Sequence, residues 1–141
     1  FIRRFGLAPK AALLSHSDFG TVETASALKM REAVRLLSLR APELEVEGEM
    51  RADTALSEEI RERVFPNSRL SGQPNLLVLP TLDAANIAFN LLKALGEGIS
   101  VGSILLGAGA GAHVLTPAVS ARGLVNMSAL AVVDAQVHAL A

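Results

Sequence analysis

The chain has 141 residues, half of them apolar, with 13 basic and 14 acidic side chains, a net charge of −1 and no cysteine. This length suits one packed domain better than two independent ones. The balanced charge gives no basis for binding a polyanion, so nucleic acid is not an expected partner. The absence of cysteine excludes disulfides, thiolate metal sites and cysteine nucleophiles, and it is compatible with a reducing, cytoplasmic location.

The start of the sequence and its longest apolar stretch bear on where the chain belongs. It opens on Phe1 without an initiator methionine and leads into strand-like sequence, which predicts that a longer chain was cut here. No signal peptide is visible. Residues 124–140 are the longest apolar stretch, but Asn126, Asp134 and Gln136 interrupt it. A buried helix is therefore expected there and a membrane span is not.

The first elements in chain order are a strand, a polar loop and a helix. Residues 11–14 are a short apolar run, and the loop at 15–20 ends in glycine. Residues 21–39 repeat apolar side chains at steps of three and four, which predicts a helix with one buried face. Pro42 lies just beyond it and breaks it.

Three further elements are expected before the middle of the chain. Residues 45–50 alternate weakly and predict a short strand whose three carboxylates form a solvated edge. Residues 52–65 predict one helix, supported by acidic side chains in its first turn. Residues 69–70 predict a brief strand before a hinge at 72–74.

The stretch at 76–95 reads as a strand that feeds a helix. Residues 76–79 are four consecutive apolar residues, typical of a strand covered on both faces in a parallel sheet. Asp83 is expected to cap the helix that follows. Ile87, Leu91 and Leu95 are expected to share one face of that helix.

The end of the chain continues this alternation. Residues 101–106 predict another buried strand, and Ser120 is expected to cap a long terminal helix. Strands alternating with helices indicate an α/β fold with a three-layer α/β/α architecture. Most charges lie before Gly72, so we expect residues 1–72 to form part of a distal lobe with the dimerisation region and residues 73–141 a core lobe.

Two stretches have residue types that suggest chemistry. The run at 107–112 formally fits a glycine pattern for dinucleotides, but an extended segment follows it where that pattern requires a helix. A tight or flexible loop is expected instead. Ser15, His16, Ser17 and Asp18 contain the types of a nucleophilic triad, yet side chains this close on one loop do not line up for it. A ligand-binding edge at the end of a strand is the favoured interpretation. His113 and His138 lack a metal-like spacing, so no metal site is expected.

Five stretches of the chain carry a family resemblance. They are PKAALLSHSDFG at 9–20, EVEGEM at 45–50, LPTLDAANIAFN at 79–90, GSILLG at 102–107 and VNMSALAVVDAQ at 125–136. They resemble phosphate acetyl/butyryltransferases, specifically the C-terminal phosphotransacetylase-like domain of large bacterial malic enzymes. The resemblance implies that this is the C-terminal part of a two-lobed fold like that of isocitrate/isopropylmalate dehydrogenases, with further α/β units before it.

The family's functional positions are altered in this sequence. Its members move an acetyl group between coenzyme A and phosphate, which requires cations for phosphate and a carboxylate near the thiol. The resemblance places the family's Ser-Arg pair at Thr116 and Pro117, and the following Asp at Gly123. It places a family Lys at Asn90 and a pocket Tyr at Val101. These replacements imply that the chain does not catalyse acetyl transfer.

The resemblance therefore implies a regulatory, catalytically inactive domain of an NADP-dependent malic enzyme, which converts malate to pyruvate and CO2. NADP and a divalent metal would bind only to a part outside this sequence. Acetyl-CoA or a related CoA ester is the expected effector, and a homodimer or higher homo-oligomer the expected assembly. The alternatives are a working phosphate acetyltransferase and a purely structural dimerisation module. The candidate ligand-binding residues are Ser15, Ser17, Asp18, Thr116 and Arg122.

Overall fold

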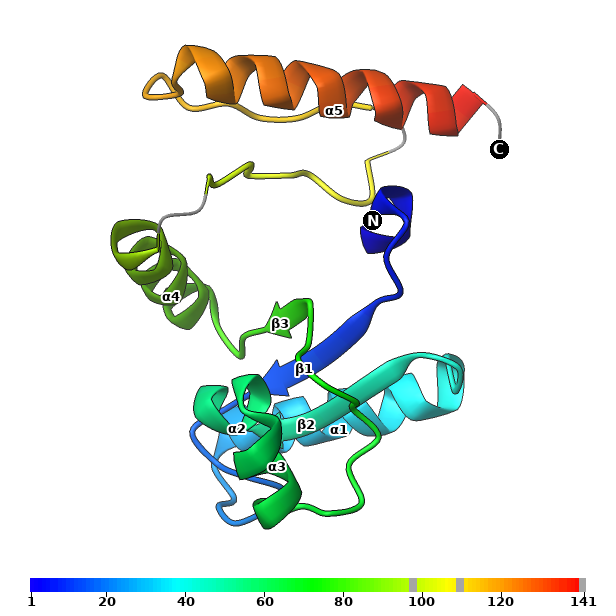
Figure 1. The fold of residues 1–141 in the computed structure, drawn as a ribbon, viewed down its shortest axis with the longest axis vertical. Coiled ribbons are helices and arrows are strands. Elements are labelled where there is room, and N and C mark those ends of the chain that lie inside the picture. Colours follow the sequence, from blue (N-terminus) through cyan, green and yellow to red (C-terminus); the bar gives the residue numbers. More distant parts are fainter. Residues whose placement is uncertain (97–98, 109–110, 140–141) are drawn as a thin grey trace. The chain divides into compact units, whose positions relative to one another are not determined.

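The computed structural model describes residues 1–96, 99–108 and 111–139, without the side chains of residues 138 and 139. The contacts within the chain divide into two units, Phe1–Leu91 and Leu92–Ala141. The boundary between these units follows Leu91, whereas the sequence pattern placed a boundary between two lobes at residue 72. The assignment of the two lobes stays a prediction. Figure 1 shows the elements of each unit, beginning with the short 3-10 helix η1 (Ile2–Phe5).

A parallel sheet forms the centre of the first unit (Figure 1). Its strand order is β2 (Glu45–Met50), β1 (Lys10–Leu14) and β3 (Leu76–Val78). Both neighbours of β1 pair with it in parallel, so the chain crosses over between consecutive strands. The strands expected near 11–14, 45–50 and 76–79 are thus confirmed. The brief strand expected at 69–70 does not form, because this segment is not paired with the sheet.

Helix α1 (Ala25–Arg40) covers one face of this sheet. Thr24 begins it, because its side chain accepts a hydrogen bond from the amide of Ala27. The predicted buried face of the helix is confirmed, since its small and apolar side chains pack on the sheet residues of the same face. This cluster consists of Ala11, Leu13, Met30 and Val46, with Ala33, Val34, Leu37 and Leu44 packed against it.

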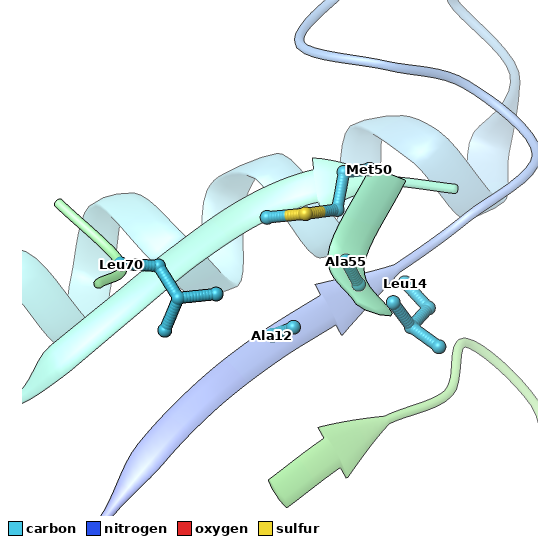
Figure 2. Close-up of a cluster of buried hydrophobic side chains, with 5 residues drawn as sticks. All are labelled: Ala12, Leu14, Met50, Ala55 and Leu70. Atoms are coloured by element: carbon cyan, nitrogen blue, oxygen red, sulfur yellow. The ribbon is translucent and has the colours of Figure 1, made fainter. Parts of the chain in front are cut away.

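Two short helices lie on the other face, where one was expected. They are α2 (Ala52–Leu56) and α3 (Glu58–Val64). Ser57 separates them because it leaves the helical conformation and accepts the amide hydrogen of Ile60 at 3.3 Å with its side chain. Figure 2 shows the cluster on this face, formed by Ala12, Leu14, Met50, Ala55 and Leu70. Helices on both faces of a parallel sheet confirm the α/β/α layering.

Strand β3 is less covered than its sequence predicted. Leu76 is 42% exposed and Val78 is 37% exposed. The expectation of a strand buried on both faces is therefore wrong for this chain. The physical reason is that β3 pairs with β1 along one edge and lies at the border of the sheet within the described residues.

Helix α4 (Leu82–Leu95) follows β3 and carries no buried residue. Its cap is Thr81, whose hydroxyl accepts the amide hydrogen of Ala84 at 3.2 Å, and not Asp83 as expected. The apolar face predicted from Ile87 and Leu95 exists as a sequence pattern, but these side chains are 62% and 82% exposed. The described residues of this chain do not cover that face.

The second unit contains the last turn of α4, an extended segment and one long helix. The described residues from 99 to 108 include no strand, so the buried strand expected at 101–106 is wrong. No neighbouring strand among the described residues offers hydrogen bonds to this segment. Helix α5 (Ala121–Ala139) confirms the predicted terminal helix, and Ser120 caps it by accepting the Gly123 amide hydrogen at 3.1 Å. None of the described helices combines the length and apolar character needed to span a bilayer.

Candidate functional site

The loop between β1 and α1, residues 15–24, closes over the end of β2. The amide of Ser15 donates to the carbonyl of Met50 at 2.9 Å, and the amide of Phe19 donates to the carbonyl of Glu49 at 2.7 Å. These two bonds hold the loop at the carboxyl ends of two parallel strands. Ligands of open α/β sheets commonly bind at such an edge.

The carboxylate of Glu49 lies at the centre of this loop. It is fully buried, and it needs partners because an uncompensated buried charge is costly. Arg31 supplies the opposite charge, with Nη2 at 3.2 Å from Oε1. The other donors to the carboxylate are the Ser15 hydroxyl at 3.1 Å, the Ser17 hydroxyl at 3.3 Å and the Gly20 amide at 2.8 Å. The expected solvated edge is therefore wrong at this position.

An irregularity in the pairing of β1 and β2 brings this carboxylate inward. Leu13 pairs with Gly48 and Leu14 pairs with Met50, so Glu49 is the extra residue. Gly48 has a φ of +144°, and a Cβ there would lie 2.5 Å from the carbonyl oxygen of Leu13. Only glycine fits this close approach of the two strands.

Glu47 is the second carboxylate of β2 that is buried and not solvated, with 7% of its surface exposed. Its two oxygens accept the amide hydrogens of Gly48 at 3.1 Å and Arg69 at 2.8 Å. Arg69 lies 22 residues away along the chain, so the sequence around β2 gave no sign of this partner. Of the three glutamates of β2, Glu45 has the partly exposed side chain, with 27% of its surface exposed.

Asp18 connects the same loop to the start of α2. Its carboxylate accepts the amide hydrogen of Arg51 at 2.9 Å and lies 3.5 Å from Nε of the same residue. Arg51 also forms a double hydrogen bond with Asp53. The hydrogen bond to Asp53 and the charges of Asp53 and Asp18 raise the pKa of the Arg51 guanidinium, and the Arg51 hydrogen bond lowers the pKa of Asp53.

The structure places Ser15, Ser17 and Asp18 on one loop and engages their polar atoms inside the protein. Ser17 is 1% exposed and Asp18 is 8% exposed. The two serine hydroxyls turn toward Glu49, while exposed His16 has its Nε2 at 3.5 Å from the hydroxyl of Thr24. The four loop residues do not line up as nucleophile, base and orienting acid.

In the second unit, the segment before Thr116 lies against α5. At Gly111 a Cβ would be 2.9 Å from the amide nitrogen of Ala135 and 3.0 Å from the carbonyl oxygen of Ala131. Glycine is thus required for the segment to approach the helix backbone. Residues 112–116 have no regular structure, so the glycine run does not open a helix, as expected. Gly109 and Ala110 of that run lie outside the described residues.

His113 and Asp134 form a buried pair that sequence reasoning missed. Nε2 of His113 lies 2.9 Å from Oδ2 of Asp134, and the two side chains are 3% and 7% exposed. Nδ1 of His113 accepts the amide hydrogen of Leu105 at 3.4 Å. His113 lies in a loop and Asp134 lies 21 residues later in a helix, so no local sequence pattern indicates that they form a pair. The side chain of His138 is outside the described residues, and the described residues hold no cluster of three metal-type ligands.

Three of the positions to which the resemblance assigns family functions lie just before α5 or in its first turn. Thr116 and Pro117 are exposed in a turn that the Val119 amide closes by donating to the Thr116 carbonyl at 3.1 Å. Arg122 is exposed in the first turn of the helix. At Gly123 a Cβ would lie 2.8 Å from Cγ2 of Val119, so a larger residue there requires that side chain to shift.

The two other positions to which the resemblance assigns family functions lie elsewhere in the chain. Asn90 lies in α4, where its side-chain amide donates to the carbonyl and the side-chain oxygen of Asn86 at 2.9 and 2.7 Å. Val101 is 42% exposed in the extended segment of the second unit. Asn90 thus belongs to the first unit, and Val101 belongs to the second.

The fold and the loop geometry define the class of the first unit. It is an α/β domain with a parallel sheet, helices on both faces and a polar loop anchored at the carboxyl ends of the strands. In this class, binding and catalysis are carried by loops at that edge. The class alone does not specify a ligand.

Comparison with known proteins identifies the family. The family model described as phosphate acetyl/butaryl transferase matches residues 1–132, and the chain belongs to this family. An NAD-dependent malic enzyme of Rhizobium meliloti is 55% identical over 94% of this chain and 17% of its own length. An NADP-dependent malic enzyme of Escherichia coli is 51% identical over 99% of this chain and 18% of its own length. The chain thus spans less than a fifth of the malic enzymes it matches.

Phosphotransacetylases are also similar to this chain. The phosphate acetyltransferase of Paracoccus denitrificans is 42% identical over 86% of the chain and 38% of its own length. The solved structure of EutD phosphotransacetylase from Staphylococcus aureus has a TM-score of 0.87 and 32% identity, covering 95% of this chain and 42% of that one. The α/β fold is therefore the phosphotransacetylase fold, as the sequence resemblance implied.

Proposed function

We propose that this chain is part of a regulatory, phosphotransacetylase-like domain of a malic enzyme, and that it binds acetyl-CoA or a related CoA ester without transferring the acetyl group. The observation that carries the proposal is an identity of 46–55% to four malic enzymes, against 42% to the phosphate acetyltransferase of Paracoccus denitrificans over a similar stretch. In the whole protein, malate oxidation to pyruvate and CO2 would take place in another part, which would hold NADP and a divalent metal. Relatives named for NAD and for NADP are both similar to this chain.

The replaced family positions support the loss of acetyl transfer. Thr116 and Pro117 provide no cation for phosphate, and Gly123 provides no carboxylate to help deprotonate a thiol. Removing one electrostatic group from a catalytic site costs about 2–4 kcal/mol of transition-state stabilisation. Two such losses leave a rate far below that of a working transferase.

We propose that the ligand binds at the start of α5, where Thr116 lies in the turn before the helix and Arg122 in its first turn. Both residues are exposed, so a hydroxyl and a guanidinium face solvent at the start of α5. A guanidinium matches the phosphate groups of a CoA ester. Ser15, Ser17 and Asp18 are assigned a smaller part, because their polar atoms already bond to Glu49 and Arg51. They shape the carboxyl edge of the sheet.

The test is a calorimetric titration of acetyl-CoA into the full protein that contains this chain, with malate-dependent NAD(P) reduction followed at the same concentrations. We expect binding together with a change in malate oxidation, and Arg122→Gln should weaken binding about tenfold, as expected for one charge-assisted contact. Arg63→Gln, which alters an exposed arginine of α3, is the matched control. Absence of both heat and a rate change would refute the proposal.

Two other functions give different results in the same experiment. A working phosphate acetyltransferase, which the identity to the Paracoccus denitrificans enzyme favours, would consume acetyl-CoA when phosphate is added. A structural dimerisation module would assemble without any response to acetyl-CoA. We also propose a homodimer or higher homo-oligomer, since apolar side chains such as Leu28 and Leu39 of α1 and Val125 of α5 are exposed. Light scattering of the full protein tests the assembly independently.

A further inference from the structure

Four donors from the loop after β1 and from α1 surround one anionic group. They are the hydroxyls of Ser15 and Ser17, the amide of Gly20 and the guanidinium of Arg31, and we name them the anion cradle. Three of these donors meet at a single oxygen, Oε1 of Glu49. Hydroxyls, loop amides and a guanidinium are the groups with which proteins bind carboxylates and phosphates.

The loop backbone holds the two hydroxyls in place without help from the Glu49 side chain. The Ser15 hydroxyl accepts the amide hydrogen of Ser17 at 2.9 Å, and the Ser17 hydroxyl accepts that of Val22 at 3.1 Å. A hydroxyl that accepts in this way keeps its own hydrogen for another acceptor. The amides that tie the loop to β2 donate to the main-chain carbonyls of Glu49 and Met50, which a change of side chain retains. The anion cradle is therefore shaped before any anion enters it.

The anion in the cradle belongs to the protein itself. The side chain of Glu49 is fully buried, and it reaches the cradle because Glu49 is the extra residue in the pairing of β1 with β2. Nε of Arg31 is buried and has no hydrogen-bond partner among the described residues, so the carboxylate does not use every donor of this guanidinium. A shorter side chain at position 49 would leave the donors of the cradle without an acceptor, which is costly inside a protein.

We propose that the anion cradle is a binding site for a small carboxylate ion, which Glu49 fills in the unaltered protein and which a free ion fills when this side chain is shortened. The ligand class is a single carboxylate such as formate, because the space that Glu49 occupies is closed to solvent. Larger anions, including the phosphate groups of a CoA ester, do not reach these donors while Glu49 is in place. The inference does not depend on where acetyl-CoA binds.

Chemical rescue of Glu49→Ala in the full protein tests this inference. Alanine removes the carboxylate and one methylene, which leaves room for formate. Hydrogen exchange of the peptide covering residues 15–24 is followed in sodium formate and, at the same concentrations, in sodium chloride. We expect formate to slow the exchange of Glu49→Ala about tenfold at about 100 mM if its dissociation constant is about 10 mM, because a bound ion suppresses opening by the factor 1 + [L]/Kd. The unaltered protein should not respond, since its own carboxylate occupies the cradle.

Glu47→Ala is the matched control, because Glu47 is also a buried glutamate of β2. Its carboxylate accepts the amide hydrogens of Gly48 and Arg69, so the donors printed by its geometry are backbone amides and not a guanidinium. The substitution removes the same atoms as Glu49→Ala and should gain little protection from formate. Glu49→Gln is a second control, because its side-chain amide still fills the space and leaves no room for the ion.

The possible results separate clearly. If Glu49→Ala does not fold by itself, formate in the refolding buffer should yield folded protein where chloride does not. Absence of a saturable formate effect on both exchange and refolding would overturn the inference. An equal effect of chloride, or an equal response of Glu47→Ala, would overturn it as well, because the protection would then not come from the anion cradle. These results leave the binding of acetyl-CoA to its own titration, so the proposed function can fail or succeed separately.

Discussion

The amide of Gly20 donates to the buried carboxylate of Glu49 at 2.8 Å, and the guanidinium of Arg31 lies 3.4 Å from the position of a Cβ on Gly20. One acidic side chain of β2 therefore fixes the path of the loop after β1 and the placement of an arginine of α1. The loop at the carboxyl edge of the sheet is shaped by a residue that the sequence assigned to solvent.

Glu49→Gln should weaken this loop. The substitution retains the size of the side chain but removes the charge that pairs with Arg31. Arg31 is 37% exposed and can be hydrated when unpaired, so the expected cost is about 2 kcal/mol, below that for breaking a fully buried pair. Hydrogen exchange of a peptide covering residues 15–24 measures it, with exposed Glu62→Gln in α3 as the control. Equal effects of the two substitutions would contradict the assigned role.

Gly48→Ala should be among the most damaging small substitutions in β2. A methyl group at Gly48 would meet the backbone oxygen of Leu13 at 2.5 Å, in a conformation that side chains rarely adopt. We expect a loss of more than about 3 kcal/mol, or failure to fold. Gly72→Ala is the control, because Gly72 also has a positive φ but has open space around it, and it should cost about 1–2 kcal/mol. The yield of folded protein and the urea midpoint measure both.

The elements with a regular apolar period were predictable from sequence. Helix α1 repeats apolar residues along one face, and that face packs on the sheet. Strand β2 was predicted correctly at 45–50, but its acidic side chains were expected to face solvent and two of them are buried. An alternating pattern assumes regular pairing, and the irregularity between Leu13 and Leu14 breaks it. The partners of Glu49 lie 18 or more residues away along the chain, so local reasoning could not find them.

The wrong predictions of burial for β3 and α4 have another physical cause. The apolar run of β3 and the apolar face of α4 correctly indicate surfaces that favour burial. In this chain those surfaces remain exposed, because a pattern shows what a segment can bury and not which segment covers it. The His113–Asp134 pair was missed for a related reason, since only the docking of the segment at Gly111 on α5 brings the two side chains together.

Arg61→Met should destabilise the first unit although it replaces a charge with an apolar side chain of similar length. Arg61 is 1% exposed, and its guanidinium donates to the carbonyls of Thr54, Ala55, Leu70 and Gly72. Methionine leaves these acceptors without the donor that joins α2 to the segment after α3. We expect a cost of about 3–5 kcal/mol. The urea midpoint measures it, and Arg63→Met on the exposed side of α3 should change it little.

The cluster formed by Lys10, Glu45 and Ser71 should make the first unit less stable in acid. Burial by itself raises the pKa of Glu45 and is the largest single influence. The Ser71 amide and hydroxyl together with Lys10 outweigh it and lower the pKa below its ordinary value of 4.5. A lowered pKa in the folded state means that the stabilisation is present above the ordinary value and is lost as pH falls through the lowered one.

Glu45→Gln tests this directly, because glutamine has a similar shape and does not titrate. The urea midpoint of the unaltered protein should fall more between pH 7 and about pH 3.5 than that of Glu45→Gln, since only the former must protonate this carboxylate. At pH 7 the variant should be the less stable of the two, because the ion pair with Lys10 at 3.6 Å is lost. The same fall with pH in both proteins would show that other carboxylates carry the acid sensitivity. In that case the lowered pKa of Glu45 would contribute nothing measurable to the loss of stability in acid.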